Sequence, residues 1–288
     1  MTNTHDNRHD DQQPVLVLGG TGKTGRRVAQ RLEQRGVRVR IASRSGETPF
    51  DWEDPSTWGP ALDGCRAVYI SYYPDLAAPG APEAVRALAD AALERGVRRL
   101  VLLSGRGEVE AQRAEQAVFD SGADVTVVRC AWFMQNFSEA FLRDAVLSGE
   151  LVLPGGDALE PWIDTDDIAD VAVAALTEPG HVGELYELTS PQLYTLTDLA
   201  AELGRATGRD VRYIPVSVDD YAAGAAEQGV PEELVGFLTY LFSEVFGHNA
   251  HTADGVQRAL GRPARDFATF AAEAAATGAW DASVPTKV

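Results

Sequence analysis

A short apolar run followed at once by evenly spaced glycines constrains this chain more than any other feature. Residues 15–25 read VLVLGGTGKTG, with glycines at Gly19, Gly22 and Gly25, and residues 26–35 continue with helical periodicity. A strand that turns through glycines into a helix lets the backbone approach a pyrophosphate, which then binds at the helix N-terminus. The spacing predicts a dinucleotide-binding turn, and a purely structural glycine turn is the alternative.

The same stretch also resembles the end of an ATP-binding phosphate loop. That loop has the pattern G-x-x-x-x-G-K-[ST], and Gly22, Lys23 and Thr24 match its last three positions. Its first glycine would fall at Val17, inside the predicted strand, so the phosphate cradle of an ATP site is incomplete. The expected ligand is therefore a dinucleotide.

The end of the next predicted strand, residues 37–42, bears on which dinucleotide binds. An acidic residue about 20 residues after the glycines commonly binds the ribose 2′-hydroxyl of NAD, but Ser43 and Arg44 stand here. A guanidinium group suits a 2′-phosphate, so NADPH is predicted, with NADH as the alternative and a solvated Arg44 as the competing interpretation. The residues expected to bind the cofactor are Gly19, Thr21, Gly22, Lys23, Thr24, Gly25, Ser43, Arg44, Ser71 and Ser104.

Short apolar runs and helical patterns alternate through the first half of the chain. The further predicted strands are residues 67–71, 97–103 and 125–129, and the helices between them are residues 82–95 and 108–121. This alternation predicts βαβ units. The expected fold class is α/β, with a Rossmann-like, doubly wound parallel sheet covered by helices on both faces.

Helical patterns dominate the rest of the chain. The predicted helices are residues 137–147, 166–176 and 196–207, together with most of residues 218–280. The expected divisions are a disordered tail at 1–13, an NAD(P)-binding Rossmann domain at 14–155, and C-terminal elements at 156–288. These last elements are predicted partly to return to the Rossmann sheet and partly to form a smaller, mostly helical substrate lobe.

Charge and cysteine content restrict the partners and the compartment. The formal net charge of −18 disfavours nucleic acid, whose binding relies on clustered positive charge. No stretch of the sequence approaches the roughly 20 apolar residues of a membrane span, and the polar start is not typical of a signal peptide. Cys65 and Cys130 form no disulfide framework, which indicates a reducing cytoplasm. The expected partner is a small molecule, and the oligomeric state stays open.

Several segments together resemble the NmrA-like branch of the atypical short-chain dehydrogenase family. They read VLVLGGTGKTGRRV, ALDGCRAVYIS, ALERGVRRLVLLSG, SGADVTVVRCAWFMQNF and PWIDTDDIADVAVAAL, and they spread over residues 15–176. The resemblance implies a Rossmann domain, a small C-terminal lobe and NAD(P) bound across the edge of the sheet. The family includes both reductases and cofactor-sensing regulators without catalytic activity.

The sequence departs from the wider family in the residues that transfer a proton. Ordinary members use a Tyr-x-x-x-Lys pair on the helix after the fifth strand, where the tyrosine donates the proton. Residues 102–119 contain neither residue type, and Ala111 stands where NmrA-like chains commonly keep a lysine. Ser104, Tyr72 and Tyr73 are the candidate catalytic residues, with a turn serine and exposed loop tyrosines as the alternative interpretations.

The missing pair also bears on the substrate. Hydride addition to a quinone produces a phenolate-like anion, whose conjugate acid has a pKa of about 10, so it needs little help from an acid. A flat, electron-poor acceptor is therefore favoured. The residues expected to line its pocket are Cys130, Trp132, Phe133, Met134, Gln135, Asn136, Phe137 and Trp162. Packing of some of them in the core is the alternative.

These observations predict an NAD(P)H-dependent reductase of an aromatic or quinonoid small molecule. Lysine-poor, arginine-rich composition is typical of a GC-rich genome, and tailoring of a polycyclic specialised metabolite is one setting for the reaction. Two alternatives stay open: reductive activation coupled to dioxygen for net hydroxylation, and NADP(H) sensing without catalysis. His248 and His251 have no identifiable third ligand, so no metal site is predicted.

Overall fold

The computed structural model describes residues 12–140 and 142–281, and it divides the chain into two compact units. The first unit comprises residues 1–130, 165–188 and 254–263; the second comprises the intervening segments and the C-terminal end. The first unit thus ends its initial run at Cys130, whereas the predicted Rossmann boundary is residue 155. The tail predicted at residues 1–13 lies outside the described residues, apart from its last two positions.

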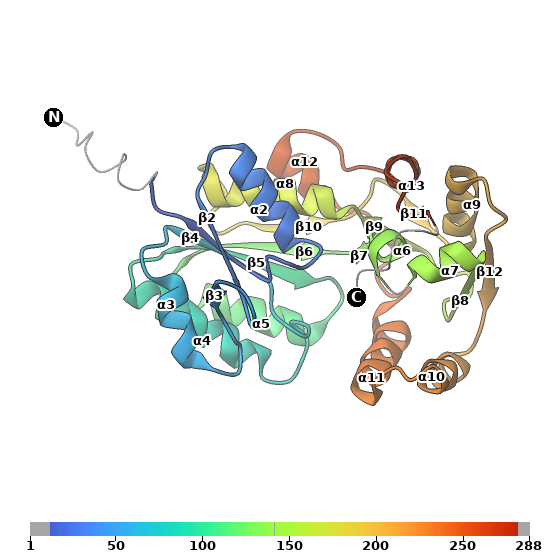
Figure 1. Ribbon diagram of the computed structural model, residues 1–288, viewed down its shortest axis with the longest axis horizontal. Coiled ribbons are helices and arrows are strands. Elements are labelled where there is room, and N and C mark those ends of the chain that lie inside the picture. Colours follow the sequence, from blue (N-terminus) through green and yellow to red (C-terminus); the bar gives the residue numbers. More distant parts are fainter. Residues whose placement is uncertain (1–11, 141, 282–288) are drawn as a thin grey trace. The chain divides into compact units, whose positions relative to one another are not determined.

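The first unit contains a sheet whose neighbouring strands are all parallel (Figure 1). Among the described residues its order is β10-β6-β5-β4-β1-β2-β3. The strands are β1 (Val15–Leu18), β2 (Val39–Ser43), β3 (Thr48–Pro49), β4 (Ala67–Ile70), β5 (Arg99–Gly105), β6 (Asp124–Cys130) and β10 (Leu185–Leu188). This topology confirms the predicted α/β class with a Rossmann-like parallel sheet.

Helices cover both faces of this sheet. Figure 1 shows α3, α4 and α5 on one face and α2, α8 and α12 on the other. Their bounds are α2 (Gly25–Gln34), α3 (Trp58–Leu62), α4 (Ala81–Glu94), α5 (Val109–Phe119), α8 (Thr165–Thr177) and α12 (Gly255–Leu260), with a 3₁₀ turn, η1, at Pro55–Thr57. Every residue of β1 and β4 is buried, because a parallel strand between two helical layers has no solvent face.

The second unit has two small sheets, ordered β11-β9-β7 and β12-β8, packed with short helices. Its strands are β7 (Trp132–Phe133), β8 (Glu150–Leu153), β9 (Glu160–Ile163), β11 (Leu193–Tyr194) and β12 (Arg212–Pro215). Its helices are α6 (Asn136–Glu139), α7 (Arg143–Ser148), α9 (Leu196–Thr207), α10 (Val218–Glu227), α11 (Glu232–Tyr240) and α13 (Phe267–Ala276), with a π-helical turn, η2, at Leu241–Val245.

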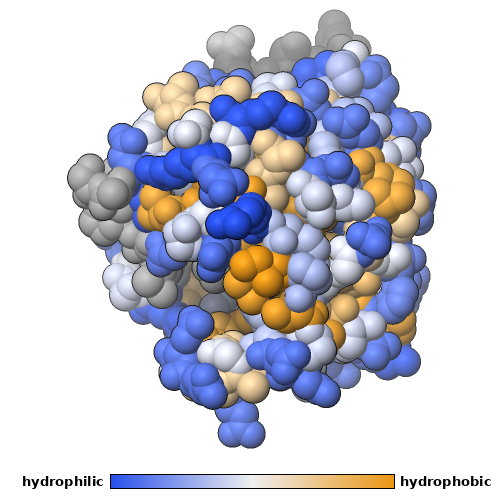
Figure 2. All heavy atoms as spheres, turned by 90° about the vertical axis from the view of Figure 1, so that its right-hand side faces the viewer, coloured by the Kyte–Doolittle hydropathy of each residue, from blue (hydrophilic) through white to orange (hydrophobic). Residues whose placement is uncertain are grey.

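The face in Figure 2 is mostly hydrophilic, with separate apolar patches. Exposed apolar side chains of the second unit include Val152 and Ile214, which pair between β8 and β12. Among residues 12–140 and 142–281, none of the helices has both the length and the apolar character needed to cross a bilayer.

Two helix predictions need correction. The single helix predicted over residues 137–147 is two short helices, α6 and α7, with Ala140 in extended backbone where α6 ends. Thr165, predicted to precede a helix at residues 166–176, is the first residue of α8. In both places local periodicity left the ends of the element undetermined.

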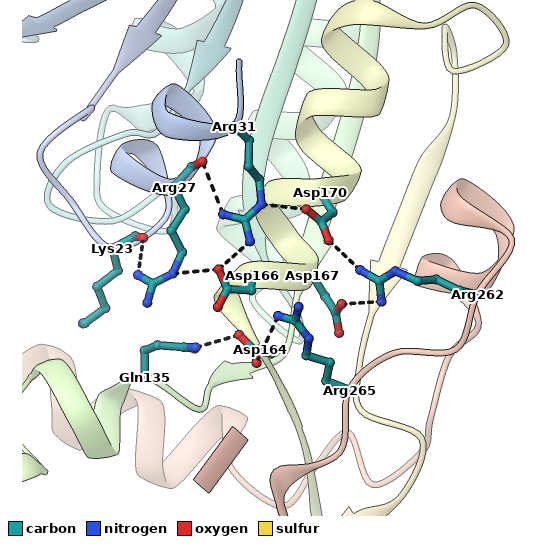
Figure 3. Close-up of polar contacts among 10 residues, drawn as sticks. All are labelled: Lys23, Arg27, Arg31, Gln135, Asp164, Asp166, Asp167, Asp170, Arg262 and Arg265. Carbon is teal, nitrogen blue, oxygen red and sulfur yellow. Dashed lines mark hydrogen bonds and ion pairs between the residues drawn. The ribbon is translucent and has the colours of Figure 1, made fainter. Parts of the chain in front are cut away.

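An ion-pair cluster joins α2, α8 and α12 within the first unit (Figure 3). Its members are Arg27, Arg31, Asp166, Asp167, Asp170 and Arg262. Arg31 on α2 reaches Asp166 at 2.5 Å and Asp170 at 2.6 Å. Arg262 follows α12 and reaches the fully buried Asp167 at 2.7 Å. The cluster ties the first helix to segments that return to this unit late in the chain.

We predict that Arg262→Ala lowers the free energy of unfolding by about 1–3 kcal/mol, because the buried carboxylate of Asp167 loses its ion pair with Arg262. Urea denaturation measures the change. Arg35→Ala is the matched control: Arg35 pairs with Glu178 at 2.9 Å on the surface, so its loss should cost less than about 1 kcal/mol. Equal losses in both variants would contradict this account.

Candidate active site

The glycine turn after β1 brings the start of α2 against the end of that strand. The amide of Gly22 donates to the carbonyl oxygen of Gly19 at 2.9 Å, and Gly19 has a positive φ of 66°. A Cβ on Gly25 would lie 2.3 Å from the Gly19 oxygen, so no other residue fits at this close approach. Thr24 precedes α2 and does not cap it with its side chain, and the first turn has no acidic residue. This geometry suits an anion at the helix start.

Loops that follow the neighbouring strands meet beside this turn. Ser71 follows β4, and its Cβ lies 3.2 Å from the point that a Cβ on Gly19 would occupy. The guanidinium of Arg44, just after β2, lies over the ring of Tyr73 at 5.0 Å from the centroid. The structure therefore brings together three positions that the sequence analysis singled out separately.

Tyr72 and Tyr73 have different surroundings. The ring of Tyr73 is exposed, whereas Tyr72 is partly buried and packs on Trp52 with 4.6 Å between ring centroids. Burial raises the pKa of Tyr72, and the charges of Glu53 and Glu83 raise it further. Tyr72 thus stays protonated over the ordinary pH range.

Ser104 belongs to a buried polar network at the ends of β5, β6 and β10. Its hydroxyl donates to Glu115 Oε1 at 2.5 Å. Arg129 donates to the same oxygen at 2.9 Å and to Glu187 at 3.2 Å, and Glu115 raises the pKa of Arg129. Because its proton is held by Glu115, Ser104 offers an acceptor oxygen in this arrangement. It suits a hydrogen bond from a donor better than proton donation.

Two carboxyl groups that the sequence analysis did not select lie at the same edge of the sheet. Asp75 follows β4, Glu108 follows β5, and the two side chains are hydrogen-bonding neighbours. Burial, with the mutual effect of the pair, raises the pKa of Glu108 to about 9, and burial also raises that of Asp75. Asp75 and Glu108 are 33 positions apart in the sequence, so no local pattern predicts their contact.

Most of the residues predicted to line a flat pocket lie in the second unit, in β7, β9, α6 and the turn before α6. Met134, Phe137 and Trp162 are core side chains there, as the alternative interpretation held, while Trp132 and Phe133 are partly exposed. Rings surround Trp132: its centroid lies 5.9 Å from that of Trp162. The rings of Phe242 and Phe246 lie at 5.4 and 5.5 Å from it.

The polar candidates nearby are engaged. Gln135 is buried and donates to Asp164 at 2.6 Å, and Asp164 also lies 3.7 Å from Arg265 (Figure 3). Asn136 is partly buried at the start of α6. Cys130 ends β6 in the first unit, and burial raises the pKa of its thiol, which keeps it neutral. In the described part of the chain no three metal-ligating side chains gather.

We expect Gly25→Ala to weaken NADPH binding at least tenfold, about 1.4 kcal/mol, because the added Cβ forces α2 away from the Gly19 carbonyl. Titration of the purified protein with NADPH measures this. Gly224→Ala on α10 is the control, since nothing lies within 4 Å of its Cβ, and it should leave the affinity unchanged. Unaltered affinity in the Gly25 variant would argue against a cofactor role for the turn.

Comparison with known proteins agrees with this geometry. The model of the NAD(P)H-binding family matches residues 19–179, from the glycine turn to just past α8. An NAD(P)H azoreductase of Xenophilus azovorans is 34% identical over 294 residues, covering 92% of this chain and 99% of that protein. A (4-alkanoyl-5-oxo-2,5-dihydrofuran-3-yl)methyl phosphate reductase of Streptomyces griseus is 33% identical over 280 residues, covering 90% and 97%.

A solved structure agrees with the predicted fold. The structure of NmrA, a negative transcriptional regulator, matches with a TM-score of 0.69 at 17% identity, over 96% of this chain and 100% of that chain. The likeness confirms the fold implied by the NmrA-like resemblance. The family model and the azoreductase relative together show that this chain belongs to the NAD(P)H-binding family of oxidoreductases, with NAD(P)H as its cofactor.

Proposed function

We propose that the protein transfers a hydride from NADPH to a flat, conjugated, electron-poor small molecule of aromatic or quinonoid type. The observation that carries the proposal is the composition of α5, the helix after β5. Its sequence, VEAQRAEQAVF, contains neither tyrosine nor lysine, so the Tyr-x-x-x-Lys pair is missing from the position where it would serve a plain carbonyl. A conjugated acceptor spreads the charge that the hydride brings, so it depends less on that pair.

The names of two relatives support this class of acceptor. One is named for azo groups and the other for an alkanoyl-oxo-dihydrofuran, so neither name describes an isolated ketone. Within the second unit, the partly exposed Trp132 stands among the rings of Phe242 and Phe246. Such a wall favours stacking of a planar molecule, and we propose Trp132 and Phe133 as the stacking residues.

The choice of NADPH rests on Arg44 at the end of β2. Its exposed guanidinium lies over the ring of Tyr73, and a guanidinium group suits a bidentate contact with a 2′-phosphate. We predict that Arg44→Ala weakens NADPH binding roughly 10–100-fold, the value of a charge-assisted hydrogen bond, and leaves NADH binding unchanged. Arg38→Ala, before β2, is the control for loss of one positive charge. Parallel titrations with both cofactors test this, and equal weakening of the two would refute it.

Acceptor assays test the function itself. Purified protein with NADPH is offered quinones, azo dyes and unconjugated ketones, and loss of NADPH absorbance is followed together with dissolved oxygen. We expect oxidation with the conjugated acceptors and little with the ketones. Oxygen uptake in step with the acceptor would favour hydroxylation of a polycyclic metabolite. Tight binding of NADPH with no oxidation by any acceptor would favour the cofactor-sensing alternative.

We place the reaction in the cytoplasm, where the free thiols Cys65 and Cys130 stay reduced.

A further inference from the structure

Two carboxyl groups flank the place where ligands bind in open parallel sheets. Such ligands lie outside the carboxyl ends of the strands where the strand order reverses, which here is between β1 and β4. Asp75 belongs to the loop after β4, the same loop in which Ser71 touches the glycine turn. Glu108 belongs to the loop after β5, and β5 pairs directly with β4. Both carboxyl groups thus come from strands at or next to the expected cofactor position.

The position of Glu108 has no structural explanation. It directly precedes α5, where an acidic residue often caps a helix, but its side chain accepts no capping hydrogen bond. Its carboxyl group instead folds back over Gly105, where a Cβ would lie only 2.0 Å from Oε1. Glu108 is 7% exposed, and its Oε2 finds no hydrogen-bond donor among the described residues. A buried carboxyl group in this position points to a shared proton with its neighbour, Asp75.

Asp75 is the accessible member of this pair. Its side chain is partly exposed, and its Oδ1 accepts from the amide of Ala77 at 2.8 Å, which fixes its orientation. The charge and the hydrogen bond of Asp75 both raise the pKa of Glu108, whereas the hydrogen bond to Glu108 lowers the pKa of Asp75 against the effect of burial. Two carboxyl groups that hydrogen-bond to each other retain one proton between them, because one of the two facing oxygens must donate.

We propose that the Asp75–Glu108 pair supplies the proton that accompanies hydride transfer, with Glu108 holding the proton and Asp75 as the catalytic acid that passes it to the acceptor. The inference rests on the proposed function. For an azo acceptor, one nitrogen gains the hydride of NADPH with its electron pair, and the N=N π bond breaks. The other nitrogen takes the proton of the pair, NADP⁺ remains, and water returns a proton to the pair.

The test compares acceptors that do and do not need this proton. Reduction of an azo dye requires a hydride and a proton. Reduction of a cationic triarylmethane dye requires only the hydride, because the carbocation is neutralised directly. We expect Asp75→Asn and Glu108→Gln each to lower kcat/KM for the azo dye about 100-fold or more, within the usual range for a general acid. For the dye cation, the loss of kcat/KM in the same variants should be at least tenfold smaller than the loss for the azo dye.

Two controls separate chemistry from folding. Glu110→Gln removes an exposed carboxylate two residues along, where Glu110 pairs with Arg113, and should change neither rate by more than about twofold. NADPH titration of every variant shows whether the cofactor site is intact. Equal losses for both dyes in the Asp75 and Glu108 variants would overturn this inference and leave the proposed function standing. A native protein that oxidises NADPH with neither dye and with none of the quinones would overturn both.

Discussion

The close approach of Gly25 to the carbonyl oxygen of Gly19 determines where the first helix of the sheet begins. Because neither residue carries a Cβ, α2 starts directly above the end of β1, and the loop containing Ser71 packs against the turn. A larger residue at either position would separate strand from helix. The loops after β2 and β4 then come within contact distance, as the pairing of Arg44 with Tyr73 shows. The cofactor-binding edge thus depends on glycine at both positions.

Ion pairs connect other helices and strands of the first unit. This is a strongly acidic chain, and many of its buried carboxylates are matched by arginines. Asp167 is matched by Arg262 and Glu115 by Arg129. Asp75 and Glu108 differ from these, because each has the other carboxyl group as its hydrogen-bonding neighbour. This pair retains a proton where the other buried carboxylates have an arginine. That proton can be transferred to a substrate.

This distinction connects the fold to the chemistry. Membership of the NAD(P)H-binding family supplies the hydride donor, and the relatives named as reductases agree with a catalytic role. The sequence of α5 contains neither tyrosine nor lysine. The hydroxyl of Ser104 is committed to Glu115, so it serves as an acceptor rather than an acid. Of the paired carboxyl groups at this edge, Asp75 is partly exposed and Glu108 is buried.

The sequence by itself determined the sheet, because strand periodicity, helix periodicity and the glycine turn are properties of neighbouring residues. It also determined the cofactor class, since the turn carries its own geometry. Only the tertiary structure decided which aromatic residues are core, because burial of Phe137 and Trp162 depends on partners far along the chain. The same holds for the contact between Asp75 and Glu108. Their strands pair across a crossover, and the burial that raises their pKa values exists only once the chain has folded.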